Sequence, residues 1–253
     1  MIAVVTATVD HDRAEPCLQS WRVHATHAYP QVVIENRGMF IGPVAAFRNG
    51  VEAAMKSQPE CDLVACFHDD LVILEQGWDQ IIEAAFAAHP EVGLASFSGY
   101  TSLGADNLYH APYNPAQLEG TGLVSSPQAQ TIVAPEAYCL IGRRVFWSGF
   151  YEAEWRTKET RRAKYPRPWA VLDDMGVVNH AYAAGLACLA RRGGWQVRYL
   201  PVRCRHLAGQ TTVRDPGYQA WAAQESEGGD RGFFEAAHRL VYEAFRDELP
   251  LRL

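Results

Sequence analysis

The stretch Leu63-Val64-Ala65-Cys66-Phe67-His68-Asp69-Asp70 decides how we interpret this chain of 253 residues. Its first five residues are apolar, which predicts a short buried strand that runs directly into a histidine and two aspartates. Ligands of α/β proteins collect at the carboxyl ends of parallel strands, so these side chains are candidates for a binding site. Adjacent buried carboxylates are costly unless a cation meets them, and hard divalent cations take carboxylate oxygens. The residues are equally compatible with a solvated turn, where aspartate is common.

Strand-like and helix-like segments alternate around this stretch. Apolar or β-branched runs predict the strands, and small-residue or amphipathic segments predict the helices. We expect strands at 2–9, 31–34, 63–67 and 92–97, and helices at 13–28, 42–54 and 78–88. This alternation predicts an α/β fold with a mostly parallel central sheet flanked by helices.

The second half of the chain departs from this alternation. It has a Gly- and Pro-containing segment of little periodicity over 98–130 and a second irregular segment over 152–169. Such long irregular stretches are typical of functional loops. Between and after them we expect strands at 131–142, 186–190 and 196–200, a short turn or helix at 143–148, and helices at 172–185 and 233–245. Because no linker is evident, we predict a single domain with an elaborated second half.

The amino-acid composition limits the classes of function that the protein could have. The net charge of −6 argues against a protein that coats nucleic acid, although it permits a local basic patch. No apolar run approaches the roughly 20 residues of a membrane span, and the first residues lack the basic start of a signal peptide. The six cysteines form no CxxC pair, so we expect reduced thiols in a cytoplasmic protein.

Several polar side chains follow the predicted strands. Thr6, Thr8 and Asp10 close the first strand, Glu35 follows the second, and His68 to Asp70 follow the third. Carboxyl ends of parallel strands share one edge of a sheet, so these groups are expected to meet there. Each of them alone would fit a solvated loop.

Asp173-Asp174 is predicted to begin a helix. Neighbouring residues on a helix point about 100° apart, so only one of the two faces a given site. One carboxylate could then cap the helix, while the other acts as a general base kept ionised by the helix N-terminus. Two ordinary N-terminal acids would give the same pattern.

Two further features are basic. His206 follows an apolar segment and is flanked by Arg203 and Arg205, which suits either a metal-bound anion or a surface histidine. Basic and aromatic residues also alternate between 155 and 169, which is typical of a phosphate-bearing or nucleic-acid partner, or of a solvated face. We therefore take five of them as acceptor-binding candidates: Trp155, Arg161, Arg162, Lys164 and Trp169.

In their order these motifs resemble the GT-A glycosyltransferases, especially the inverting family-two-like branch, over residues 2–206. Val32-Val33-Ile34-Glu35-Asn36 looks like the nucleotide-binding start, and Gly42-Pro43-Val44-Ala45-Ala46-Phe47-Arg48-Asn49-Gly50 is similar to the helix that lines the nucleotide pocket. His68-Asp69-Asp70 matches the DXD motif, with histidine in place of the first acid. The segment from Ala137 to Phe146 resembles the acceptor-side strand and turn.

The resemblance implies a GT-A (Rossmann-like) domain with a nucleotide-binding half (1–98), an acceptor and catalytic half (99–210) and a C-terminal helical tail (211–253). It implies transfer of a hexose, with inversion, from a nucleotide-diphosphate sugar, UDP favoured, with Mn²⁺ or Mg²⁺ as cofactor. Asp70 and His206 would hold the metal, and Asp174, paired with Asp173, would be the catalytic base. The nucleotide sugar would contact seven residues: Thr6, Thr8, Glu35, Arg48, Asn49, His68 and Asp69.

The acceptor is left open by the sequence. The basic segment would suit a polyanion such as DNA carrying a modified base, while a glycan or lipid phosphate would fit equally well. Two other functions stay open. One is a nucleotidyltransferase, which the absence of glycine from residues 6–13 disfavours, and the other is a non-catalytic nucleotide-sugar-binding module.

Overall fold

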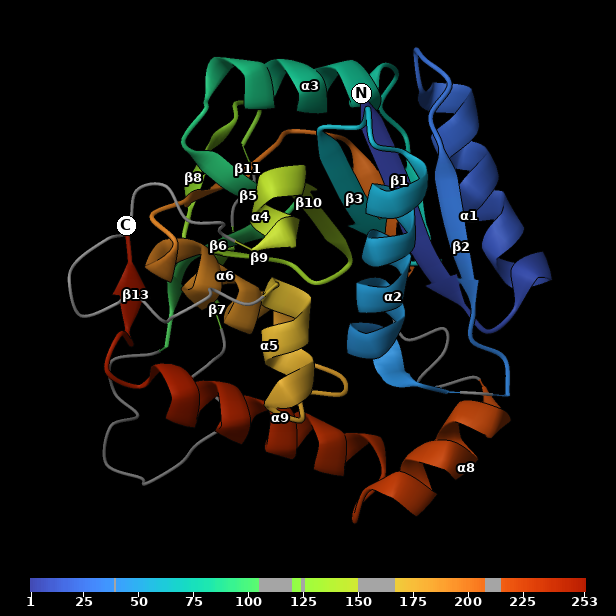
Figure 1. Ribbon diagram of the computed structural model, residues 1–253, viewed down its shortest axis with the longest axis vertical. Coiled ribbons are helices and arrows are strands. Elements are labelled where there is room, and N and C mark those ends of the chain that lie inside the picture. The colour runs from blue at the N-terminus through green and yellow to red at the C-terminus, as the bar shows by residue number, and fades with distance from the viewer. Residues whose placement is uncertain (39, 105–119, 124–125, 150–166, 208–214) are drawn as a thin grey trace.

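The structure is a computed structural model that describes residues 1–38, 40–104, 120–123, 126–149, 167–207 and 215–253. Its centre is a seven-stranded sheet in the order β2-β1-β3-β10-β5-β11-β8 (Figure 1). Five strands are parallel to one another: β1 (Ile2–Thr8), β2 (Gln31–Glu35), β3 (Leu63–Phe67), β5 (Val92–Ser96) and β11 (Gln196–Tyr199). Two strands are antiparallel to them: β8 (Gln130–Ile132) and β10 (Cys139–Arg143). The predicted mostly parallel sheet flanked by helices is confirmed.

Helices cover both faces of this sheet. Side chains alternate along β1, so Ile2 and Val4 join one core cluster and Ala3 and Val5 the other. The first cluster packs under α1 (His11–His24) and α3 (Trp78–Ala88). The second packs under five helices: α2 (Gly42–Ser57), α4 (Arg144–Ser148), α5 (Pro168–Asp174), α6 (Tyr182–Arg192) and α9 (Asp230–Phe245).

Two smaller sheets complete the fold. In the first, β4 (Leu71–Ile73) pairs antiparallel with β12 (Cys204–His206), and His206 stands opposite Leu71. This pairing brings His206 beside Asp70, because Leu71 directly follows Asp70. The second sheet contains four strands: β6 (Gly99–Leu103), β7 (Gly120–Leu123), β9 (Ala134–Pro135) and β13 (Leu251–Arg252).

The C-terminal segment adds α8 (Pro216–Glu225) before α9. In Figure 1, α9 crosses below α5 and α6, and α8 lies below the N-terminal end of α2. No helix in the described ranges is long and apolar enough to cross a membrane.

The predicted helix 172–185 is wrong. The helix α5 ends at Asp174, and Gly176 follows with a φ of 79°. Glycine in this left-handed conformation is a common helix C-terminal signal, because it has no Cβ to clash. The next helix, α6, begins at Tyr182 and includes the predicted strand 186–190. Asp173 and Asp174 therefore end a helix rather than begin one.

The predicted strand 131–142 is also wrong as a single element. It is divided into three strands: β8 pairs with β11, β9 pairs with β6, and β10 pairs with both β3 and β5. The prediction included no helix at α8, although Asp215-Pro216 is a helix-start signal and the Asp215 carboxylate accepts a hydrogen bond from the Tyr218 N–H.

Candidate functional site

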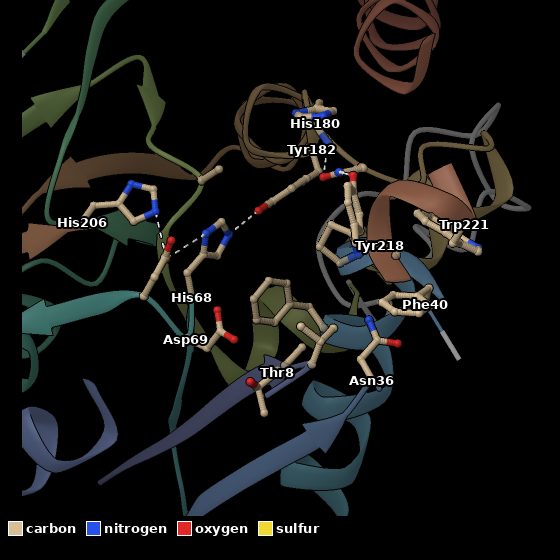
Figure 2. Close-up of a pocket in the computed structure, with 18 residues that line it drawn as sticks. Thr8, Asn36, Phe40, His68, Asp69, His180, Tyr182, His206, Tyr218 and Trp221 are labelled. Carbon is tan, nitrogen blue, oxygen red and sulfur yellow. Dashed lines mark hydrogen bonds and ion pairs between the residues drawn. The ribbon is translucent and has the colours of Figure 1, made fainter. Parts of the chain in front are cut away.

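A cavity of about 240 Å³ opens at the carboxyl ends of β1 and β3 (Figure 2). Thr8 closes β1, and Asn36 follows β2. His68, Asp69 and Asp70 follow β3 directly, so they enter the cavity from the carboxyl end of that strand. The remaining walls come from the N-terminal end of α2, the loop between α5 and α6, and α8.

Three side chains at one end of the cavity form a cluster that could hold a metal ion. One nitrogen from each of His68 and His206 and one oxygen of Asp70 lie within 4.8 Å of one another. His206 Nε2 is 3.0 Å from Asp70 Oδ1, and His68 Nδ1 is 3.9 Å from the same oxygen. The turn after β3 supplies two of these residues, and the pairing of β12 with β4 supplies the third.

The donor atoms of this cluster fit a divalent cation. Asp70 Oδ1 and His206 Nε2 are buried, and within the described part of the chain neither has a properly aligned hydrogen-bond partner, despite their separation of 3.0 Å. His68 Nε2 lies 2.6 Å from the Tyr182 hydroxyl. When Nε2 carries the proton and donates to Tyr182, the lone pair of Nδ1 is left for a metal. Two imidazole nitrogens and a carboxylate suit a transition metal better than Mg²⁺, which prefers oxygen ligands.

The protonation states also suit cation binding. Burial lowers the pKa of His68 to about 4, which outweighs the opposing effect of Asp70, so the imidazole is neutral at pH 7. Burial alone would raise the pKa of Asp70, but His206 and His68 beside it bring that pKa below its usual value. A neutral imidazole and an ionised carboxylate are the ligand forms that bind metals.

Asp69 occupies the middle of the cavity. Its carboxylate points into the space between Thr8 and His68 (Figure 2). Burial raises its pKa to about 6, and the Thr8 hydroxyl only partly offsets this effect. Asp69 can therefore accept a hydrogen bond from a ligand hydroxyl near neutral pH.

The end of the cavity farthest from the cluster is aromatic. The rings of Phe40 and Trp221 are stacked with centroids 6.2 Å apart, and Tyr218 lies 5.6 Å from Trp221. Asn36 borders these rings with an amide that can donate and accept hydrogen bonds (Figure 2). Flat aromatic walls beside an amide suit a planar heterocycle. Phe40, Tyr218 and Trp221 were not among the predicted site residues. A sequence signal existed for Tyr218 and Trp221, because a spacing of three residues places both side chains on one face of a helix.

Five predicted site residues line the cavity together: Thr8, His68, Asp69, Asp70 and His206. The structure gives His68 a place in the metal cluster in addition to its predicted contact with the nucleotide. Thr6 is fully buried below the cavity. Glu35 is exposed and lies 2.9 Å from His11 Nε2, and its neighbour Asn36 lines the cavity instead.

Four other predicted residues lie away from the cavity wall. Arg48 forms an ion pair with Asp173, and its guanidinium also donates to Asn49, so these three side chains join α2 to α5. Asp174 is exposed at the end of α5. The prediction that the N-terminus of a helix keeps the Asp174 carboxylate ionised is wrong, because Asp174 lies at the C-terminus of α5, where the helix dipole is negative.

Trp169 belongs to the core rather than to a surface. It is 2% exposed and is stacked between Phe47 and Trp147, with ring centroids 5.7 Å from each. The other acceptor candidates, Trp155, Arg161, Arg162 and Lys164, lie outside the described residues.

No protein-family model matches the chain, and no curated protein is significantly similar to it in sequence. Solved structures show a weak likeness to the chain, as three of them illustrate. A197 from STIV has 8% identity and a TM-score of 0.46, over 83% of this chain and 86% of that chain. A glycosyltransferase involved in glycosylation of the major capsid of PBCV-1 has 11% identity and a TM-score of 0.35, over 63% and 72%. Mannose-1-phosphate geranyltransferase from Thermus thermophilus has 11% identity and a TM-score of 0.40, over 89% and 79%. Scores this low assign no function to this chain.

Proposed function

We propose that this protein is a metal-dependent glycosyltransferase that moves a sugar from a nucleotide-diphosphate sugar to an acceptor hydroxyl with inversion. One observation carries the proposal: a metal-ligand cluster and an aromatic wall stand at opposite ends of one cavity at the edge of the sheet. A nucleoside diphosphate has matching ends, a planar base and an anionic diphosphate that binds a divalent cation.

Different residues of the cavity contact different parts of this ligand. Phe40 and Tyr218 hold the base by stacking, Trp221 supports the Phe40 ring from behind, and Asn36 hydrogen-bonds the edge of the base. Asp69 and Thr8, midway along the cavity, accept hydrogen bonds from the ribose hydroxyls. The cluster of His68, Asp70 and His206 would hold a divalent cation, Mn²⁺ in preference to Mg²⁺. When bound, such a cation supplies Lewis-acid stabilisation of the leaving diphosphate.

A donor screen tests the proposal. UDP-, GDP-, ADP-, CMP- and dTDP-sugars are incubated with the protein in Mn²⁺ or Mg²⁺ and then in EDTA, with UDP-hexoses as the favoured donors. We expect slow, metal-dependent release of one nucleotide, abolished in His206→Ala. His89→Ala, at the end of α3 away from the cavity, is the matched control. Absence of both release and metal-dependent nucleotide binding would refute the proposal.

A non-catalytic nucleotide-sugar-binding module is the second candidate. The exposed position of Asp174, away from the cavity wall, favours it, because the predicted catalytic base then has no access to a bound donor. The two functions differ in turnover. Tight metal-dependent binding of a nucleotide sugar that is never cleaved, with any acceptor in a broad screen, would favour the binding module.

A further inference from the structure

A second cavity of about 350 Å³ adjoins the first. Ala137 lines both cavities. Ala181 lines the second and its neighbour Tyr182 lines the first, so the boundary passes between adjacent residues at the start of α6. The volume lies within the range of small-ligand sites, roughly 300–1,000 Å³. A ligand in the second cavity would therefore lie directly beside a ligand in the first.

The walls of the second cavity combine small, aromatic and acidic side chains. The start of α6 contributes Ala183 and Ala184, which leave space where larger side chains would fill it. Phe234 of α9 and Tyr100 of β6 supply aromatic rings. Such rings pack against the C–H faces of a sugar, while a nearby charged group binds its hydroxyls.

Among the described residues that line this cavity, Glu136 supplies the carboxylate. It immediately precedes Ala137, so it stands at the boundary with the first cavity. The Tyr100 hydroxyl donates a hydrogen bond to the Glu136 carboxylate, and the Glu136 N–H donates to the Ser98 carbonyl at 3.1 Å. The carboxylate is thus oriented by a neighbouring strand. Asp174 lines neither cavity.

We propose that the second cavity binds the acceptor, a carbohydrate, and that Glu136 is the catalytic base. The inference rests on the proposed function. Glu136 takes the proton of the acceptor hydroxyl while the hydroxyl oxygen forms a bond to the anomeric carbon of the donor sugar. The bond from that carbon to the diphosphate oxygen breaks, and its electron pair leaves with the nucleoside diphosphate. Tyr100 is a positioning residue that orients the carboxylate.

Direct binding tests the cavity without any need for turnover. Methyl glycosides of glucose, galactose, mannose and N-acetylglucosamine are added to the protein in UDP and diamagnetic Mg²⁺, and saturation-transfer NMR detects binding. We expect at least one to bind the wild type and His206→Ala, and none to bind Ala184→Leu, whose side chain fills the cavity. Ala184→Val replaces Ala184→Leu if the larger residue prevents folding. Absence of binding to the wild type, or equal binding to the folded cavity-filling variant, would overturn the proposal.

Transfer kinetics then test the base, using the donor that the screen identifies. We expect Glu136→Gln to lower kcat by about 10²- to 10⁴-fold, with UDP affinity unchanged within about twofold. Glu60→Gln, an exposed control, should retain wild-type kcat. Tyr100→Phe should lower kcat without a comparable change in KM. An inactive Asp174→Asn beside an active Glu136→Gln would overturn the assignment. If the screen identifies no donor, both the proposed transfer function and the assignment of Glu136 as its base are refuted. The glycoside-binding experiment would still show whether the second cavity binds a carbohydrate.

Discussion

At the scale of single residues, Tyr182 joins the metal-ligand cluster to the α/β scaffold. Its hydroxyl lies 2.6 Å from His68 Nε2, and its ring is buried at the start of α6. The hydrogen bond orients the His68 imidazole and leaves Nδ1 toward Asp70. Such outer partners of metal ligands matter because they set both the ring orientation and the tautomer.

Replacing Tyr182 by phenylalanine should weaken metal binding while preserving the packing of the ring. We expect the affinity for Mn²⁺ to fall by about 10- to 100-fold, the range for loss of an outer partner. This affinity is measured by titrating the protein with Mn²⁺ and monitoring free Mn²⁺ by electron paramagnetic resonance. Tyr199→Phe is the control, because its hydroxyl bonds the Ser126 carbonyl away from the cluster. Equal Mn²⁺ affinity in the two variants would contradict the role of Tyr182.

At the scale of elements, α8 and the loop before α6 are held together by polar contacts. The Tyr218 hydroxyl donates to Asp230 at 2.5 Å and accepts from the Asn179 amide at 2.7 Å. His180 Nε2 lies 2.9 Å from the same Asp230 oxygen. This network anchors the far end of Tyr218 and therefore holds the aromatic wall against the cavity.

Loss of one ring from this wall should weaken nucleotide binding. Stacking on an aromatic ring contributes about 1–3 kcal/mol per base, so Phe40→Ala should lower UDP affinity in Mn²⁺ by roughly 5- to 150-fold. Isothermal titration calorimetry measures the change. Trp195→Ala serves as the control, because Trp195 packs on Gly93 of β5, away from the cavity. Similar UDP affinity in both variants would mean that the base does not stack there.

A buried carboxylate ties the start of α3 to the chain that follows α1. Asp79 accepts hydrogen bonds from the Thr26 and His27 N–H groups at 2.8 and 2.9 Å. Burial alone would raise the pKa of Asp79, but these hydrogen bonds bring it below its usual value. The ionised carboxylate is therefore more strongly stabilised in the folded chain than in the unfolded one.

Asp79→Asn should lower the free energy of unfolding at pH 7 by about 1–3 kcal/mol. The carboxylate contributes fully above its unfolded pKa, near 3.9, and the contribution is lost as pH falls through the lower folded pKa. The difference between wild type and variant should therefore shrink toward pH 3. Urea unfolding at the two pH values measures this, and a difference independent of pH would contradict the ionic contribution of Asp79.

At the scale of the whole molecule, the six cysteines are free thiols distributed through the core. Five are buried and Cys204 is partly so. Burial raises the pKa of Cys17 to about 11 and that of Cys188 to about 12. It also raises the pKa of Cys66 and Cys139. Because the thiolate is the reactive form, these groups are chemically protected by the fold.

Reaction with Ellman's reagent should therefore report global unfolding. At pH 8 the five buried thiols of the native protein should react slowly, and all six thiols should react rapidly in denaturant. The count of thiols measured by absorbance checks this. Rapid reaction of several thiols in the native protein would show that the core opens without denaturant.

The sequence alone located the central motif and, apart from the short strand β4, the helices and strands of the first half. Apolar periodicity acts over a few residues, so it located the first strands and helices and placed His68, Asp69 and Asp70 at a sheet edge. Even the end of α5 had a local signal in Gly176, which the interpretation of Asp173-Asp174 as a helix start overlooked.

Only the tertiary structure decided which distant groups meet. The pairing of β12 with β4 brings His206 to Asp70, and the packing of α8 brings Tyr218 and Trp221 opposite Phe40. The boundary between the two cavities, where Glu136 stands, depends on the same long-range packing. These contacts join segments far apart in the chain, and a sequence pattern that acts over one turn or one strand carries no information about them.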